Sequence, residues 1–163
     1  MDDAVRLGRA LRRRGWRLAV AESCTAGLLG YHITEVPGSS VYFIGGVIVY
    51  ADALKMRLLQ VQETTLQCWG AVSPQVALEM AAGVCRLTGA DVGVSITGIA
   101  GPGGWTSEKP VGLTYIALAV PGERWVWRHV WRGDRRANRE SSAQAALAHL
   151  VKYLAAPEIT PTN

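Results

Sequence analysis

Short apolar segments alternate with helical segments along this chain, and this alternation leaves few fold classes open. Five segments that are apolar or rich in β-branched and aromatic side chains are the expected strands, namely residues 18–21, 41–50, 91–97, 111–120 and 124–131. Segments with helical periodicity are residues 3–14, 25–34, 51–59, 74–88 and a last one after Asp134. Strands that alternate with helices pair mainly in parallel and are covered on both faces. The sequence therefore predicts a three-layer α/β/α sandwich with a mixed, mainly parallel sheet of about five strands.

Turn and capping residues mark the ends of several elements. Pro121 and Gly122 separate the last two strands and predict a hairpin, which gives the sheet one antiparallel strand. Ser73 and Asp134 are the expected N-caps of the two longest helices, and Gly89 is expected to end the first of these.

The 163 residues are the usual size of one domain, and the chain contains no internal repeat, low-complexity segment or linker. We expect one domain over residues 1–156 and a frayed tail over residues 157–163. No run of about 18 apolar residues is present, and the N-terminus lacks the apolar stretch of a signal peptide, so no membrane association is expected.

The three cysteines, Cys24, Cys68 and Cys85, are odd in number and have no C-x-x-C spacing. This pattern argues against a disulfide framework and against a zinc site, and it favours a reducing compartment. We therefore expect a cytoplasmic protein that needs no metal.

The formal net charge is +4, and arginines gather in residues 6–17 and 124–139. Such stretches either form solvated faces or attract an anionic ligand such as a phosphate. Arg136 and Arg139, near the start of the last helix, could reach such a phosphate. Of the two, Arg136 is the predicted phosphate ligand. The basic stretches match no recognised nucleic-acid motif, so a small molecule is the expected ligand.

Ser23, Cys24 and Thr25 lie where the first expected strand gives way to a helix. Backbone N–H groups at a helix N-terminus suit a phosphate or a tetrahedral oxyanion, so this turn is a candidate for the nucleophile and for substrate contacts. The alternative is that Ser23 or Thr25 simply caps the helix. Cys24 is a competing nucleophile, because a thiol at a helix N-terminus can have a lowered pKa, but His129 and His149 offer no obvious base for it.

Tyr50 and Lys55 follow the second expected strand. The chain has only three lysines against fourteen arginines, so each lysine is a candidate for a specific role. A desolvated lysine can lose its charge near neutral pH and act as a general base, and Tyr50 could donate a hydrogen bond or relay a proton. The alternative is an exposed helical lysine beside a packed tyrosine.

A glycine-rich segment follows the third expected strand. Glycines let the backbone approach a ligand closely and can direct several N–H groups at one anion. The spacing fits neither a Walker loop nor a dinucleotide fingerprint, and the alternative is a plain connection between strands. The candidate substrate contacts in this segment are Thr97, Gly98, Gly101 and Gly103.

Seven short stretches occur in a distinctive order over roughly residues 4–154. They are AESCTAG (21–27), VPGSS (36–40), GGVIVYADALK (45–55), GAVS (70–73), TGIAGPGG (97–104), EKPVG (108–112) and GDR (133–135). No single stretch is diagnostic, but their order and spacing together are highly specific. In these stretches the chain resembles the CinA C-terminal domain family, whose characterised members are nicotinamide-nucleotide amidases.

The resemblance implies hydrolysis of nicotinamide mononucleotide to nicotinate mononucleotide and ammonia, a salvage reaction of pyridine nucleotides that uses no cofactor. The family's nucleophilic serine matches Ser23, its lysine matches Lys55 and its accompanying tyrosine matches Tyr50. Cys24 and Thr25 then become substrate contacts beside the nucleophile.

Three residues depart from the family's usual pattern. Ala26 stands where many members have glycine, Asp52 stands where asparagine is common, and Trp105 is bulky for its place beside the glycine loop. A carboxylate close to Lys55 would favour the charged lysine, so we expect the Asp52 carboxylate to point away from it.

Two other functions and one question of assembly stay open. A nucleotide-binding module without catalysis would keep the glycine loop but release no ammonia, and a nucleic-acid-associated protein would bind DNA or RNA with a steep salt dependence. Trp125, Trp127 and Trp131 alternate along the last expected strand, so one of its faces is aromatic and forms either core or the contact of a homodimer.

Overall fold

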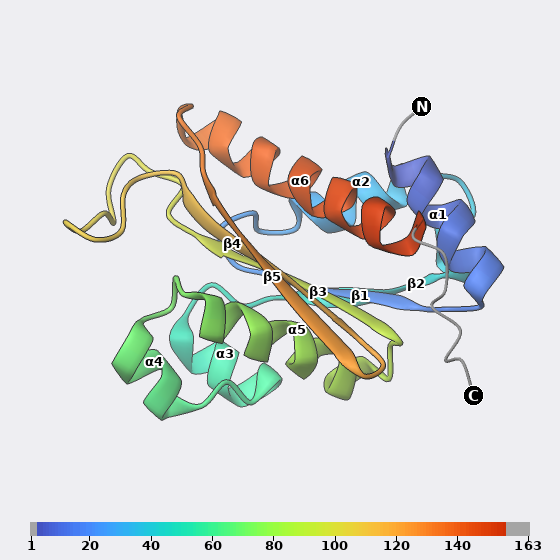
Figure 1. Ribbon diagram of the computed structural model, residues 1–163, viewed down its shortest axis with the longest axis horizontal. Helices are drawn as coiled ribbons and strands as arrows, with labels where there is room; N and C mark the ends of the chain where they lie inside the picture. The colour runs from blue at the N-terminus through green and yellow to red at the C-terminus, as the bar shows by residue number, and fades with distance from the viewer. Residues whose placement is uncertain (1–2, 156–163) are drawn as a thin grey trace, which may run out of the picture.

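The computed structural model describes residues 3–155 (Figure 1). Its strands are β1 (Leu18–Glu22), β2 (Phe43–Ile48), β3 (Val92–Gly98), β4 (Leu113–Val120) and β5 (Glu123–Val130). Its helices are α1 (Asp3–Arg14), α2 (Leu28–Thr34), α3 (Asp52–Leu59), α4 (Glu63–Trp69), α5 (Pro74–Thr88) and α6 (Arg135–Ala155), with a short 3-10 helix η1 at Ser39–Val41. The expected tail over residues 157–163 lies outside the described residues.

The five strands form one sheet in the order β2-β1-β3-β4-β5. β1 pairs in parallel with both β2 and β3, whereas β4 pairs antiparallel with both β3 and β5. β4 is therefore the one strand that runs against the other four, and the β4–β5 pair is the predicted hairpin. The prediction of a mixed, mainly parallel sheet is confirmed.

Helices cover both faces of this sheet, with α1, α2 and α6 on one face and α3, α4 and α5 on the other (Figure 1). On the first face, Leu11 of α1 and Leu150 of α6 are buried in one cluster with Val94 of β3. On the second face, Met80 of α5 is buried in a cluster with Ala21 of β1. Fully burying one large aliphatic side chain contributes about 1.5–3 kcal/mol, so the two clusters hold the three predicted layers together. No helix within residues 3–155 combines the length and the apolar character needed to cross a membrane.

The position of each strand in the sheet explains its sequence. β1 and β3 are central, covered on both faces and almost wholly buried, which is why they read as continuous apolar runs. β5 is an edge strand, and its aromatic face packs on α6. The Trp127 ring stacks on His149 with 4.1 Å between centroids, and Trp131 Nε1 donates to Ser142 Oγ at 2.9 Å. Trp127 is partly buried and packs against the core, in line with the interpretation as core, whereas Trp131 is only partly buried and Trp125 is 48% exposed.

The predicted caps occur as expected. Ser73 Oγ accepts a hydrogen bond from Val76 N at 3.3 Å, and Asp134 Oδ1 accepts one from Ala137 N at 2.8 Å. Gly89 ends α5 in the left-handed conformation, with φ of 70°.

Two helical predictions need correction. α2 begins at Leu28 rather than at residue 25, because Ala26 and Gly27 have φ of 52° and 96° and form a turn. The helix α4 was not predicted from the sequence. None of its described residues is buried, so it lacks the apolar stripe by which a helix is recognised.

Candidate active site

The carboxyl ends of the parallel strands β2, β1 and β3 meet at one edge of the sheet, on the left in Figure 1. Ser23 directly follows β1, Tyr50 lies two residues after β2, and the glycine-rich loop follows β3. Ser23 N donates to Ile96 O at 2.9 Å, which ties the turn after β1 to the end of β3. Ligands of open α/β sheets bind at this edge, so the topology brings the predicted catalytic residues to the expected place.

The side chain of Glu22 occupies the N-terminus of α2. Its Oε2 accepts hydrogen bonds from Gly27 N at 3.0 Å and Leu29 N at 3.1 Å, and its Oε1 accepts one from Gly30 N at 2.9 Å. Glu22 is only 1% exposed, and these charge-assisted bonds replace the water that the carboxylate loses. The first N–H groups of α2 are therefore not free to bind a substrate anion, contrary to the expectation. The alternative that Ser23 or Thr25 caps this helix is also wrong.

The Ser23 hydroxyl lies in the turn between β1 and α2, and Ser23 is 8% exposed. Within residues 3–155 no other residue forms a hydrogen bond with this hydroxyl or with the N–H groups of Cys24 and Thr25. The Thr25 hydroxyl is also buried and has no partner in the same residues. Among the described residues, the turn thus keeps a nucleophilic oxygen without a partner close to N–H donors that also have none.

Cys24 is a poor candidate for the nucleophile. Its side chain belongs to the core cluster beneath α1 and α6. Burial, together with the nearby Glu22 carboxylate, raises the pKa of the Cys24 thiol to about 11. The expected lowering of this pKa at a helix N-terminus is therefore wrong, because Glu22 neutralises that terminus and the core surrounds the sulfur.

Lys55 is one of the most deeply buried side chains of the protein, with 1% of it exposed. Its Nζ donates a hydrogen bond to Tyr50 O at 3.0 Å and another to Asp52 Oδ1 at 3.0 Å. The expected inward turn of Lys55 is confirmed. The expectation that the Asp52 carboxylate points away is wrong, because residues three apart on a helix lie side by side, and Asp52 reaches Lys55 within the first turn of α3.

The Tyr50 side chain is 58% exposed, so the alternative of a packed tyrosine is wrong. Its hydroxyl accepts a hydrogen bond from Arg135 Nη2 at 3.2 Å. Arg135 Nη1 also donates to Gly101 O at 2.8 Å. One guanidinium group therefore links the segment after β2 to the loop after β3.

The first turns of α6 hold two further segments of the site. Arg139 Nε donates to Cys24 O at 3.1 Å, and its Nη2 donates to Thr25 O at 2.8 Å. Asn138 Nδ2 donates to Ala100 O at 3.0 Å, and Asn138 is 2% exposed. Sequence reasoning missed the roles of Arg135 and Asn138. The sequence pattern that could have revealed these roles is the spacing of polar side chains at positions i, i+3 and i+4. This spacing places Arg135, Asn138 and Arg139 on one helix face.

In the glycine-rich loop, two of the predicted substrate contacts, Thr97 and Gly98, have structural roles. The Thr97 hydroxyl donates to Ala71 O at 2.8 Å, so it anchors the segment before α5. A Cβ atom on Gly98 would lie 2.7 Å from Thr114 Oγ1, so this glycine is required by the close approach of β3 and β4. Gly103 has open space around it, in the loop that projects beyond the body of the molecule in Figure 1. The predicted substrate contacts in this loop stay predictions.

Arg136 is exposed, and its guanidinium group has no hydrogen-bond partner within residues 3–155. Its role as a phosphate ligand is a prediction too. The same described residues contain no group of three or more His, Cys, Asp or Glu side chains that could hold a metal ion.

Comparison with known proteins gives a consistent family. The sequence model of the CinA C-terminal domain matches residues 2–154. A CinA-like protein from Desulfotalea psychrophila is 52% identical over 148 residues, which cover 91% of this chain and 36% of that protein. A CinA-like protein from Desulfovibrio desulfuricans is 51% identical over 145 residues, covering 88% of this chain and 34% of that protein. The chain thus spans about a third of the length of these curated relatives.

Solved structures agree with this sequence match. The crystal structure of a competence-damaged protein (CinA) superfamily protein from Klebsiella pneumoniae superposes with a TM-score of 0.91 at 35% identity, over 94% of this chain and 96% of that one. A competence/damage inducible protein from Agrobacterium tumefaciens gives a TM-score of 0.86 at 35% identity, over 93% of this chain and 96% of that one. The chain belongs to the CinA C-terminal domain family.

Proposed function

We propose that this domain is an amidase that hydrolyses the carboxamide of nicotinamide mononucleotide to nicotinate mononucleotide and ammonia. One observation carries the proposal: a lysine side chain with 1% exposure lies after β2, and the neighbouring strand β1 ends directly before Ser23. A fully buried lysine is rare, because removing the charged amine from water is costly, and Asp52 holds the Lys55 amine in this enclosed position. The match of Ser23, Lys55 and Tyr50 to the family's serine, lysine and tyrosine supports the same roles.

The reaction is acyl transfer through Ser23. Neutral Lys55 accepts the proton of the Ser23 hydroxyl while Oγ forms a bond to the carboxamide carbon. The tetrahedral intermediate then breaks its carbon–nitrogen bond, and the nitrogen leaves as ammonia with the proton that Lys55 had accepted. Water attacks the resulting ester with Lys55 again acting as the base, which releases the acid and restores Ser23.

The N–H groups of Cys24 and Thr25 are the proposed donors to the oxyanion of this intermediate. They follow the nucleophile directly, and no other residue within residues 3–155 accepts from them. Removing one such donor typically costs about 3–4 kcal/mol of barrier. The buried Thr25 hydroxyl, which also has no partner in these residues, is a second group that substrate binding would pair.

The substrate's phosphate is the proposed source of binding energy. The net charge of +4 favours an anionic ligand, and the exposed Arg136 supplies a cation at the start of α6, on the same helix turns that contact the site. Binding energy from a group remote from the amide can be used to position the amide for attack. The free cysteines fit a reducing compartment, and we place the reaction in the cytoplasm.

Incubation of the purified protein with nicotinamide mononucleotide tests the proposal. We expect equal amounts of ammonia and nicotinate mononucleotide, each rising in proportion to enzyme concentration. A protein that binds the mononucleotide without releasing ammonia would be the non-catalytic binding module instead.

A further inference from the structure

The Lys55 amine has only two acceptors within hydrogen-bond distance in residues 3–155. These are the carbonyl oxygen of Tyr50 and Oδ1 of Asp52, each 3.0 Å from Nζ. Lys55 itself is 1% exposed, whereas the side chain of Asp52 is 54% exposed. The amine is thus enclosed by the protein, and its one charged partner lies at the surface.

This geometry suits both protonation states of the amine. A neutral amine has two hydrogens and one lone pair, and the two acceptors can take both hydrogens. The remaining position on nitrogen is then the lone pair, which can accept a proton. In the charged form the same position holds the third hydrogen. The carboxylate and the carbonyl therefore orient the amine in either state.

The charge of Asp52 distinguishes the two states. A carboxylate 3.0 Å from the amine stabilises the ammonium ion more than the neutral amine, because attraction between opposite charges adds to the hydrogen bond only in the charged form. Since a general base must be neutral, Asp52 opposes the active form of Lys55 while it holds the amine in place.

No other charged group around α3 contacts the Lys55 amine within the described residues. On α5, Glu79 accepts from Gln62 N and from the Thr65 hydroxyl, and Arg86 donates to Leu59 O. At the end of β1, the Glu22 carboxylate faces α2, and on α6, Arg135 contacts the Tyr50 hydroxyl rather than its carbonyl. On α3 itself, Arg57 is exposed. Asp52 is the one carboxylate in contact with the Lys55 amine within the described residues.

We propose that Asp52 is a positioning residue whose carboxylate stabilises the charged form of Lys55, so that its negative charge sets the pH range in which the amidase is active. This inference rests on the proposed function of Lys55 as the base. Asp52 acts through Lys55 and does not touch the substrate.

The Asp52→Asn variant tests the inference, because the amide oxygen can still accept the hydrogen bond while the negative charge is removed. The rising limb of the pH–rate profile should move to lower pH by about one unit, the low end of the range for a neighbouring charge because Asp52 is half exposed. At a fixed pH below the limb, the variant should therefore be about tenfold faster than wild type. The matched control is Glu35→Gln, which removes an exposed carboxylate beyond α2 on the opposite face of the sheet and should leave the limb unmoved. A limb that stays in place in Asp52→Asn overturns the inference.

A second measurement separates this inference from the proposed function. The chain has three lysines, so protein labelled with ¹⁵N-lysine gives three Nζ signals, and the Lys55→Arg variant assigns the one of interest. The Lys55 signal should change from its charged to its neutral position at lower pH in Asp52→Asn than in wild type. An unchanged titration overturns the inference even if the enzyme is active. If the two proteins show this titration difference but the wild type hydrolyses no nucleotide amide, the result contradicts the proposed function alone.

Discussion

The guanidinium group of Arg139 donates a hydrogen bond to the carbonyl oxygen of Thr25 at 2.8 Å, across 114 residues of chain. A second bond from the same group reaches the carbonyl oxygen of Cys24. Helix α6 therefore anchors the turn that carries Ser23, and the same helix also contacts Tyr50 and the glycine-rich loop. Hydrogen bonds from a charged donor are worth about 1.5–3 kcal/mol each, so this one side chain fixes the position of the nucleophile.

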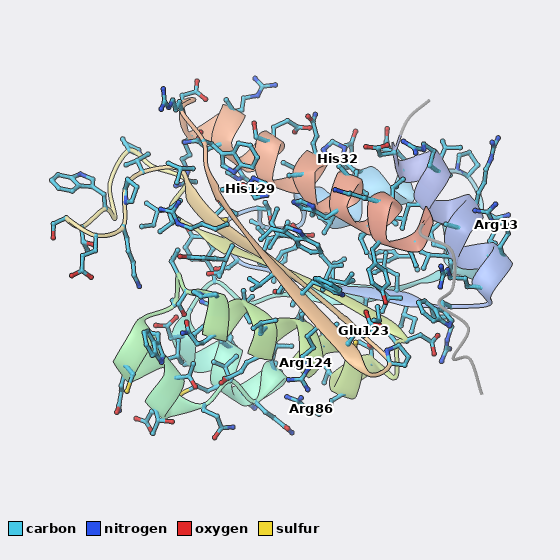
Figure 2. All side chains as sticks on the ribbon, viewed as in Figure 1. Arg13, His32, Arg86, Glu123, Arg124 and His129 are labelled. Atoms are coloured by element: carbon cyan, nitrogen blue, oxygen red, sulfur yellow. The ribbon has the colours of Figure 1, made fainter. Side chains whose placement is uncertain are left out.

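Replacing Arg139 by alanine should lower kcat by roughly 10- to 100-fold with a smaller change in KM, because the nucleophile turn loses its anchor while the substrate contacts remain. Arg139→Lys, which can keep one of the two bonds, should recover part of the loss. Arg13→Ala is the matched control, since Arg13 lies on α1 at the opposite end of the molecule from the first turns of α6 (Figure 2). Steady-state kinetics on the three variants measure the effect. An equal loss in Arg13→Ala, or none in Arg139→Ala, would show that the turn does not need this anchor.

The histidine pair between β5 and α6 predicts a pH dependence of stability rather than of catalysis. His129 Nε2 and His149 Nε2 lie 2.9 Å apart, and burial lowers the pKa of both rings, that of His149 to about 4. An unfolded histidine takes up a proton near pH 6.5, so the unfolded chain binds more protons than the folded one between pH 6.5 and 4. The free energy of unfolding should therefore fall as the pH drops through this window.

Urea denaturation at pH 7 and pH 5 measures this effect. Allowing for the partial exposure of the pair, we expect wild type to lose about 1 kcal/mol on acidification. His149→Phe keeps a ring to stack on Trp127 but has no proton to gain, and it should lose less. The same loss in both proteins would mean that other groups cause the pH dependence.

The proposed use of the phosphate predicts a strong preference among substrates. Nicotinamide and its riboside should have values of kcat/KM about 100-fold or more below that of the mononucleotide, because they lack the charge-assisted contacts. Arg136→Ala should reduce this difference in kcat/KM, because it should lower kcat/KM for the mononucleotide and leave the values for the other two substrates unchanged. Equal kcat/KM for nicotinamide and the mononucleotide would contradict the proposal that the phosphate supplies binding energy.

Local patterns were enough to predict most of the fold. The α1 boundaries follow from an amphipathic run that Gly15 ends, and the β4–β5 hairpin follows from Pro121 and Gly122 between two apolar runs. α4 could not be predicted in this way, because the burial that normally marks a helix is missing from it. The order of the strands in the sheet was not predicted, and it is this order in the structure that brings the ends of β1, β2 and β3 together at one edge.

The contacts that complete the site were less predictable. Arg139 meets Thr25, and Arg135 meets Tyr50, across separations that no local pattern encodes. Glu22 reaches forward to cap α2, although Ser23 and Thr25 look like the capping residues by type. The contact between Asp52 and Lys55 could have been predicted from the sequence, since residues three apart on a helix are neighbours. The chemical argument that a base should avoid a carboxylate led to the wrong expectation there.

The role of Lys55 as base predicts the outcome of one substitution. Lys55→Arg keeps a positive charge but cannot deprotonate at any usable pH, so the variant should bind the mononucleotide and fail to hydrolyse it. Calorimetric titration measures the binding, and ammonia release measures the turnover. Lys152→Arg, on the exposed side of α6, is the matched control and should stay fully active. Substantial turnover by Lys55→Arg would make Lys55 a binding or electrostatic residue.

The central claim is that Ser23 forms the bond to the substrate carbon, and ammonia release from nicotinamide mononucleotide by Ser23→Ala and Cys24→Ala tests it most directly. Ser23→Ala should lose roughly a thousandfold or more in kcat while circular dichroism and nucleotide binding stay close to wild type. Cys24→Ala should remain active, because its thiol is buried in the core and its raised pKa keeps it protonated. Turnover close to wild type in Ser23→Ala, together with its loss in Cys24→Ala, would contradict the account.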